Sequence, residues 1–361
     1  MRWFIATLAF LTGLLALDRG ISQGLSFSYV RVSHDDISLA RRAHADAYIF
    51  GDSRAKHHYH PGILKKHCGL TFFNAGAEGQ GILYLRGLSN LLEQIDQPKL
   101  YVVNLNLNDL MDKDFRYVRL AALRPYMAES SAIQDMLLTY GWREYLRMPG
   151  YAPHVMDGIE WGSHLKNTWK LHWKKLVRLA LFKTFCYNGQ LPTLLPETDS
   201  AIAGFVPLGG NLGSQPIEAE WQMRSELDLY TVKQLIDFVK QARQKNIAVV
   251  FCIGPSYREQ RQDPGLRPDE SFHLAALREC AWFLKVPLIE MGPETYPVFK
   301  QKALYQDLEH LNAQGAETFS EILGPLLAKS LQFKDSGVTP FLPAILPKDY
   351  VIVPGFFYQL M

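Results

Sequence analysis

The chain has 361 residues, of which 48% are apolar and 20% are charged, and its formal net charge is +2. A chain of this length and composition can bury a substantial core in one large domain or two small ones. Nucleic-acid-binding proteins usually carry a clear excess of basic residues, and this chain has almost none. We therefore predict no nucleic-acid partner.

The N-terminal stretch MRWFIATLAFLTGLLALDRG carries no charge from Trp3 to Leu17 and begins behind the basic Arg2. An apolar run behind a basic residue is typical of an export signal. No small-x-small cleavage pattern follows, so residues 1–24 are predicted to form an uncleaved signal anchor. With Arg2 in the cytoplasm, residues 25–361 would lie on the extracytoplasmic (periplasmic) side of a bacterial cell membrane. The alternative interpretation is a buried core helix.

Short apolar runs alternate with helical patterns along most of the chain. Strands are predicted at 47–50, 70–74, 101–105, 246–253 and 286–289, and helices from 53, over 82–94, over 218–245, up to 284 and after 310. Such alternation is typical of a parallel sheet with helices on both faces. The predicted fold class is therefore α/β, a three-layer α/β/α sandwich with a mostly parallel sheet.

The alternation fails over residues 115–216, which we interpret as an aromatic and basic insertion. Within it, Leu165, Trp169 and Trp173 fall on one side of a predicted helix, with lysines around the others. Such a helix can lie on an anionic lipid surface or pack its aromatic face against the sheet domain. The tail, residues 335–361, is interrupted by four prolines, so we expect irregular structure and no membrane-spanning helix there.

Three polar residues form a candidate catalytic set. Ser53 follows the first predicted strand, where it is either a nucleophile or a helix cap. A serine nucleophile needs a base oriented by a carboxylate, and Asp307 and His310 can meet on one helical turn. Gly76 and Asn108 follow neighbouring strands, and loops at the carboxyl ends of parallel strands converge. Both residues are therefore candidate donors to an oxyanion.

Four motifs together resemble the SGNH, or GDSL-type, hydrolase superfamily over residues 45–330. They are GDS at 51–53, NAG at 74–76, NLND at 106–109 and DLEH at 307–310. The resemblance implies a flavodoxin-like fold in which Ser53 is the nucleophile and His310 the base oriented by Asp307. It implies an oxyanion hole formed by the Ser53 amide, Gly76 and Asn108, and no cofactor.

Two positions depart from the family pattern. Asn106 stands where the third motif usually has glycine, and Arg54 follows the serine where leucine or isoleucine is frequent. The rival α/β-hydrolase fold requires Gly-x-Ser-x-Gly at a turn that normally follows several strands. Ser53 comes after one predicted strand and lacks the second glycine, so this rival is rejected.

The anchor and the motifs together resemble an envelope-anchored branch that includes alginate O-acetylation and teichoic-acid D-alanylation proteins. This implies an extracytoplasmic serine esterase or O-acyltransferase that acts on acyl groups, chiefly acetyl, of cell-envelope polysaccharide through an acyl-Ser53 intermediate. It also implies a membrane-bound O-acyltransferase as partner. The alternatives are a catalytically inactive domain that binds polysaccharide or that partner, and a lipid-acting esterase. In the enzyme, activity should fall with acid as His310 is protonated.

The histidines and cysteines of the chain are the candidate ligands for a metal ion. His57, His58, His60 and His67 cluster after the serine, whereas Cys68, Cys186, Cys252 and Cys280 are widely spaced and form no zinc pattern. We interpret the histidines as a helix-start cluster near the substrate mouth and predict no metal site. An extracytoplasmic location would permit disulfides, with a pairing that the sequence leaves open.

Overall fold

The computed structural model describes residues 2–32, 36–111, 120, 122–139, 203–212, 227–257 and 268–332. The chain divides into two compact units. The first comprises Met1–Ser38 and Ala122–Thr198, and the second comprises Leu39–Ala121 and Asp199–Met361. The predicted helix near residue 169, Cys186 and the tail at 335–361 lie outside the described residues.

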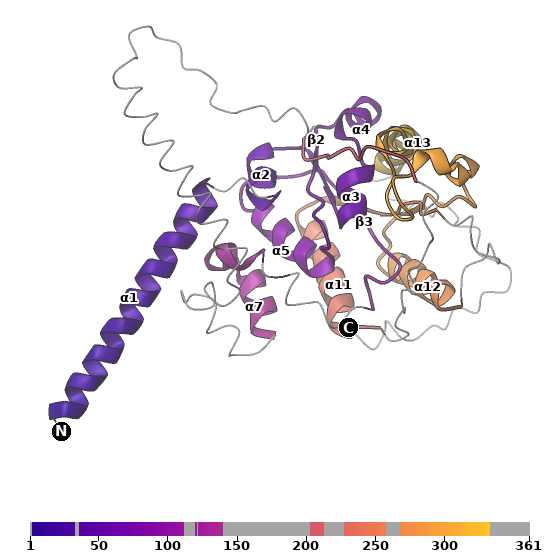
Figure 1. Ribbon diagram of the computed structural model, residues 1–361. Helices are drawn as coiled ribbons and strands as arrows, with labels where there is room; N and C mark the ends of the chain where they lie inside the picture. The colour runs from indigo at the N-terminus through magenta and orange to yellow at the C-terminus, as the bar shows by residue number, and fades with distance from the viewer. Residues whose placement is uncertain are drawn as a thin grey trace, which may run out of the picture. The chain divides into compact units, whose positions relative to one another are not determined.

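A sheet of five strands, all parallel, forms the centre of the second unit (Figure 1). The strand order is β2-β1-β3-β4-β5, which is the flavodoxin-like order. The strands are β1 (Ala47–Phe50), β2 (Phe72–Asn74), β3 (Leu100–Asn104), β4 (Ala248–Ile253) and β5 (Leu288–Glu290). The α/β prediction is confirmed, and every strand boundary lies within about two residues of the predicted one.

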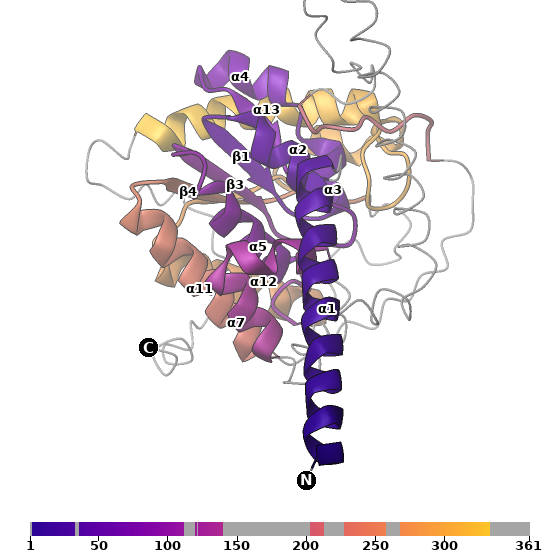
Figure 2. The same cartoon turned by 90° about the vertical axis from the view of Figure 1, so that its left-hand side faces the viewer.

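Helices cover both faces of this sheet. In Figure 2, α4 and α13 lie on one side of the strands, and α5, α11 and α12 lie on the other. α13 also packs against α3 and α4. The described α-helices that lie wholly within this unit are α3 (Ser53–His58), α4 (Pro61–Cys68), α5 (Ile82–Leu92), α11 (Leu229–Gln244), α12 (Pro268–Phe283) and α13 (Ala313–Gln332).

The strands are apolar on both faces because both faces are covered. On one face Ile49 belongs to a buried cluster with Val102 and Phe319. On the other face Phe50 packs edge-on against Tyr101, with ring centroids 5.0 Å apart, and Tyr101 stacks on Phe238 at 5.5 Å. Alternate residues of β1 therefore anchor the two helical layers, which fixes the position of the turn that follows this strand.

The first unit contains α1 (Arg2–Val32), the 3-10 helix η1 (Arg124–Glu129) and α7 (Ser131–Thr139), and α2 (Asp36–Ala43) spans the boundary between the units. Within this unit the Ser38 and Tyr126 hydroxyls are hydrogen-bonded at 2.6 Å. The large apolar side chains along the first half of α1 are exposed, namely Trp3, Phe4, Ile5, Leu8, Phe10, Leu11, Leu14 and Leu17. In the described part of the chain, no helix is both long enough and apolar enough to cross a bilayer.

The end of the predicted insertion returns to the sheet unit. Residues 203–212 run beside the end of β2, where the Asn74 N–H donates to the Ala203 carbonyl oxygen at 2.8 Å. Farther along, the Leu212 N–H donates to the Tyr305 carbonyl oxygen at 2.7 Å. This segment therefore connects the end of β2 with the region just before His310.

Candidate active site

Ser53 lies at the start of α3, immediately after the turn that ends β1. Gly51 has φ +144°, and a Cβ there would come within 2.9 Å of both Ala55 Cβ and Asn104 Cβ, so this tight turn requires glycine. Asp52 is the N-cap, because its carboxylate accepts the Arg54 N–H at 2.9 Å. Of the two sequence-based alternatives, the capping role therefore belongs to Asp52, and the Ser53 hydroxyl has another partner.

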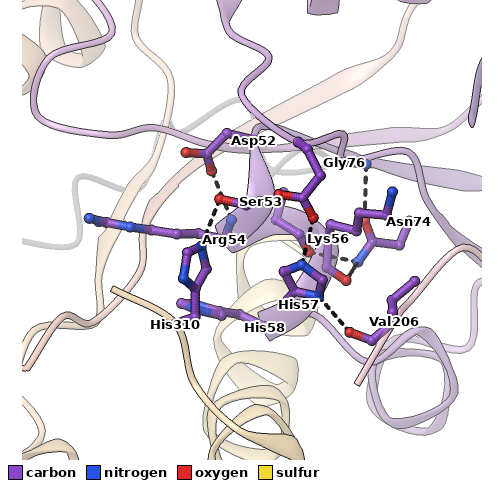
Figure 3. A network of polar contacts seen from close by, with 12 residues as sticks. Asp52, Ser53, Arg54, Lys56, His57, His58, Asn74, Gly76, Val206 and His310 are labelled. Carbon is purple, nitrogen blue, oxygen red and sulfur yellow. Dashed lines mark hydrogen bonds and ion pairs between the residues drawn. The ribbon is translucent and has the colours of Figure 1, made fainter. Parts of the chain in front are cut away.

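That partner is His310. The Ser53 hydroxyl donates to His310 Nε2 at 2.7 Å across 257 positions of sequence (Figure 3). The other ring nitrogen, Nδ1, donates to Asp307, with Oδ2 at 2.9 Å and Oδ1 at 3.0 Å. These contacts select the tautomer that carries its proton on Nδ1, which leaves Nε2 free to accept the serine proton.

Asp307 and His310 meet in a turn, so the predicted helical turn is wrong. Tyr305 and Leu311 form an isolated antiparallel bridge, and α13 begins only at Ala313. Asp307 Oδ1 accepts the N–H groups of residues 309 and 310, each at 2.8 Å. A carboxylate that binds nearby backbone N–H groups competes with helix formation, and here it folds the turn that presents His310.

Asp307 and His310 shift each other's pKa in opposite directions. Burial of the ring lowers the pKa of His310, but the hydrogen bond and the charge of Asp307 outweigh burial, so the net pKa lies above 6.5. Burial raises the pKa of Asp307, but its hydrogen bonds to the His310 ring and to backbone N–H groups lower it to about 2. Asp307 is therefore ionised at neutral pH, as an orienting acid must be.

The predicted oxyanion donors differ in their surroundings. At the first position of a helix, the Ser53 N–H has no intrahelical carbonyl to bind. The Gly76 N–H, in contrast, already donates to Asn74 Oδ1 at 3.0 Å. A Cβ at Gly76 would lie 2.5 Å from Lys56 N, so glycine is needed there for close packing against α3. In this arrangement Gly76 supports the serine turn, and its N–H is committed within the chain.

Asn106, in the loop after β3, lies beside the serine turn. Asn106 Nδ2 donates to Asp52 Oδ2 at 2.5 Å, and the Asn106 N–H donates to Asp109 Oδ2 at 2.8 Å. Asn108 is exposed, and its carbonyl accepts the Met111 N–H at 2.9 Å. The contact between Asp52 and Asn106 joins the loops that follow β1 and β3. The strand order reverses between these two strands. In open parallel sheets, ligands bind in the crevice at the carboxyl ends of the strands where the order reverses.

Two histidines of the predicted cluster contact the site. His57 Nδ1 donates to the Val206 carbonyl oxygen at 2.7 Å, and its Nε2 lies 2.7 Å from Glu78 Oε1. His58 is fully buried, and its Nε2 accepts the Leu311 N–H at 3.0 Å. Burial holds the pKa of His58 well below 6.5, so this ring is a neutral acceptor that fixes the residue after His310.

The other two histidines lie elsewhere. His60 is the N-cap of α4 and accepts the Ile63 N–H at 3.4 Å, and His67 Nε2 lies 2.7 Å from Glu321 Oε2. Within the described ranges, no three His, Cys, Asp or Glu side chains are grouped so that they could hold a metal ion. Cys68, Cys252 and Cys280 are free thiols.

Sequence reasoning assigned no role at the site to four groups that lie near it, namely Arg54, Glu78, Asn106 and Val206. For Glu78 the signal is indirect. It pairs with His57, which lies one turn after Ser53 on α3 and so faces the same side. No signal points to Val206, which reaches α3 from a segment without periodicity.

Comparisons with known proteins give limited information. No family model and no curated protein matches the sequence. Among solved structures, the chain is similar to the crystal structure of an acetyl xylan esterase, at 13% identity and a TM-score of 0.33 over 81% of this chain and 100% of that one. So low a score supports no argument about activity. The resemblance to SGNH hydrolases therefore rests on the four sequence motifs.

Proposed function

We propose that the protein is a serine esterase or O-acyltransferase that forms an acyl-Ser53 intermediate. The observation that carries the proposal is the continuous chain of contacts from Ser53 Oγ through both nitrogens of His310 to Asp307, at 2.7 and 2.9 Å. A serine with a hydrogen-bonded imidazole and an ionised orienting carboxylate is the arrangement that activates a hydroxyl for acyl transfer.

In the proposed reaction, His310 Nε2 takes the Ser53 proton as Oγ attacks the ester carbonyl carbon. The resulting oxyanion accepts a hydrogen bond from the Ser53 N–H. When the C–O bond breaks, His310 returns its proton to the leaving alkoxide, which leaves the acyl group on Ser53. The acceptor, water or a sugar hydroxyl, then loses its proton to His310 and attacks the acyl carbon. The bond between the acyl carbon and Ser53 Oγ breaks, and His310 gives its proton to Oγ, which regenerates the serine.

Acetyl groups of envelope polysaccharide are the substrates that the family resemblance suggests. We further propose that the protein is attached to the bacterial membrane through α1, facing the periplasm beside a membrane-bound O-acyltransferase. The exposed apolar side chains of the first half of α1, such as Trp3 and Phe10, support attachment. Membrane fractionation with alkaline extraction tests it, because deleting residues 1–24 should release the protein into the soluble fraction.

One observation favours a second candidate function, a catalytically inactive domain that binds polysaccharide or the acyltransferase partner. The N–H of Gly76 is occupied by Asn74 Oδ1, so one of the three expected oxyanion donors does not serve in this arrangement. Fold and nucleophile alone do not guarantee activity.

Labelling with a fluorophosphonate separates the two functions. We expect the purified protein to be labelled and Ser53→Ala to lose the label entirely. Ser330→Ala is a matched control, because the Ser330 hydroxyl donates only along its own helix, to the Leu326 carbonyl oxygen at 2.9 Å. A folded protein that takes up no label would contradict the enzyme and favour the binding domain.

A further inference from the structure

Arg54, the residue after the nucleophile, has an incompletely paired guanidinium. Its side chain is 14% exposed, and its one charged partner among the described residues is Glu309, with Nη2 at 3.6 Å from Oε1. Arg54 Nε is buried and has no hydrogen-bond partner there. Arg278, in contrast, is fully paired with a carboxylate, because its Nε and Nη2 each donate to a Glu290 oxygen at 2.7 Å.

The Arg54 guanidinium lies close to the catalytic set. Figure 3 shows its side chain running past the His310 ring, next to Ser53. Its positive charge lowers the pKa of His58 and opposes the effect of Asp307 on the pKa of His310, which places the charge near both rings. A ligand group bound by Arg54 would therefore lie beside the ester that Ser53 attacks.

The neighbouring acids do not neutralise this cation by direct hydrogen bonds. Asp52 accepts from the Arg54 backbone N–H and from Asn106, and Asp307 accepts from His310 and its own turn. Glu309 is 47% exposed, so it can turn into water at little cost when another anion arrives. The planar fork of a guanidinium matches the two oxygens of a carboxylate.

We propose that Arg54 binds a carboxylate of the substrate, so that the preferred substrate is an ester that carries a carboxylate close to the scissile bond. This inference rests on the proposed acyl transfer at Ser53. A singly charged carboxylate fits better than a doubly charged phosphate, because the carboxylate of Glu309 already lies 3.6 Å from the one cation and repels added negative charge. Arg54 is thus a specificity-determining residue.

The test compares two esters that differ only in charge, 3-acetoxybenzoate and its neutral methyl ester. The readout is the ratio of kcat/KM for the acid to kcat/KM for the methyl ester, so intrinsic ester reactivity largely cancels between variants. Arg54→Gln should lower this ratio about 10- to 100-fold, the range for a charge-assisted hydrogen bond. Arg54→Lys should retain part of the preference, and Glu309→Gln should increase it because the competing carboxylate is removed.

Lys240→Gln is the charge-matched control. Lys240 is exposed near the end of α11 that leads into the start of β4, at the edge of the sheet opposite Ser53. Its loss should leave the ratio unchanged. An unchanged ratio in Arg54→Gln, or an equal loss for both esters, would overturn the proposal, and the equal loss would assign Arg54 to positioning the turn through Glu309. A larger Arg54 dependence for 3-acetoxyphenyl phosphate would overturn the choice of carboxylate.

Two further measurements keep this inference separate from the proposed function. Inhibition of methyl-ester turnover by benzoate but not benzamide is expected in the wild-type chain, whether or not the Arg54 variants fold. Binding of 3-hydroxybenzoate to Ser53→Ala should be lost in Ser53→Ala/Arg54→Gln. Binding that depends on Arg54 without any turnover would reject acyl transfer and keep the anion site. Turnover without that dependence would reject the anion site alone.

Discussion

Replacing Asp307 by asparagine tests how His310 is oriented. Asp307 Oδ1 accepts two backbone N–H groups at 2.8 Å, so in Asp307→Asn the amide oxygen should keep those bonds and the NH2 group should take the place of Oδ2. That NH2 would face His310 Nδ1 and favour the tautomer that carries its proton on Nε2. Such a ring cannot accept the Ser53 proton.

The size of the effect follows from the two oxygen distances. Oδ1 also lies 3.0 Å from Nδ1, so the productive tautomer keeps one neutral hydrogen bond. Exchanging a charge-assisted bond for a neutral one costs about 1 kcal/mol, and placing an N–H opposite the new NH2 costs about 1–3 kcal/mol. The sum, roughly 2–4 kcal/mol, is a loss of about 30- to 1000-fold in kcat.

The assay is 4-nitrophenyl acetate hydrolysis at alkaline pH, with the free energy of unfolding measured in urea for each variant. Asp307→Asn should remain nearly as stable as the wild type because the turn keeps its backbone bonds. Asp307→Ala, which loses those bonds, should be both inactive and less stable. If Asp307→Asn kept kcat within about threefold of the wild type, Asp307 would not be the residue that orients the base.

Three more predictions follow from the geometry. Because the pKa of His310 is raised above 6.5 and the base must be neutral, kcat/KM should fall as the pH decreases through a midpoint above 6.5, and a pH-rate profile with no such acidic limb would contradict His310 as base. Gly76→Ala places a methyl group 2.5 Å from a backbone nitrogen of α3 and should destabilise the fold by about 1–3 kcal/mol, measured in urea. The control Gly209→Ala, with open space around it, should not. His58→Phe leaves the buried Leu311 N–H without its acceptor, so we expect a loss of about 1–3 kcal/mol, and an unchanged urea midpoint would show that this bond does not hold the turn.

The sequence was sufficient to predict the sheet because its signals are local. The run Ala47–Phe50 is apolar on both faces and ends at a glycine, and these features predicted β1 and its boundaries correctly. One predicted helix start became two helices, α3 and α4, because the chain leaves helical geometry at Tyr59 and Pro61 starts a new helix.

The candidate site was predictable only in part, because its contacts depend on tertiary packing. The meeting of Ser53 with His310 follows from parallel strands whose loops converge at one edge. The Gly76 N–H is occupied because the Asn74 side chain turns toward it, and the spacing of residues in the sequence does not reveal that direction. The contact of Asn106 with Asp52 depends likewise on the path of the loop after β3, which the sequence does not reveal.

The contact between Ser53 and His310 joins positions 257 residues apart, and this separation has a consequence for synthesis. As the ribosome extends the chain, Ser53 is added early, while the imidazole to which it is hydrogen-bonded is added only after most of the protein has been made. The hydrogen bond between Ser53 and His310 can therefore form only late in synthesis, and acyl transfer at Ser53, as we propose it, would begin only then.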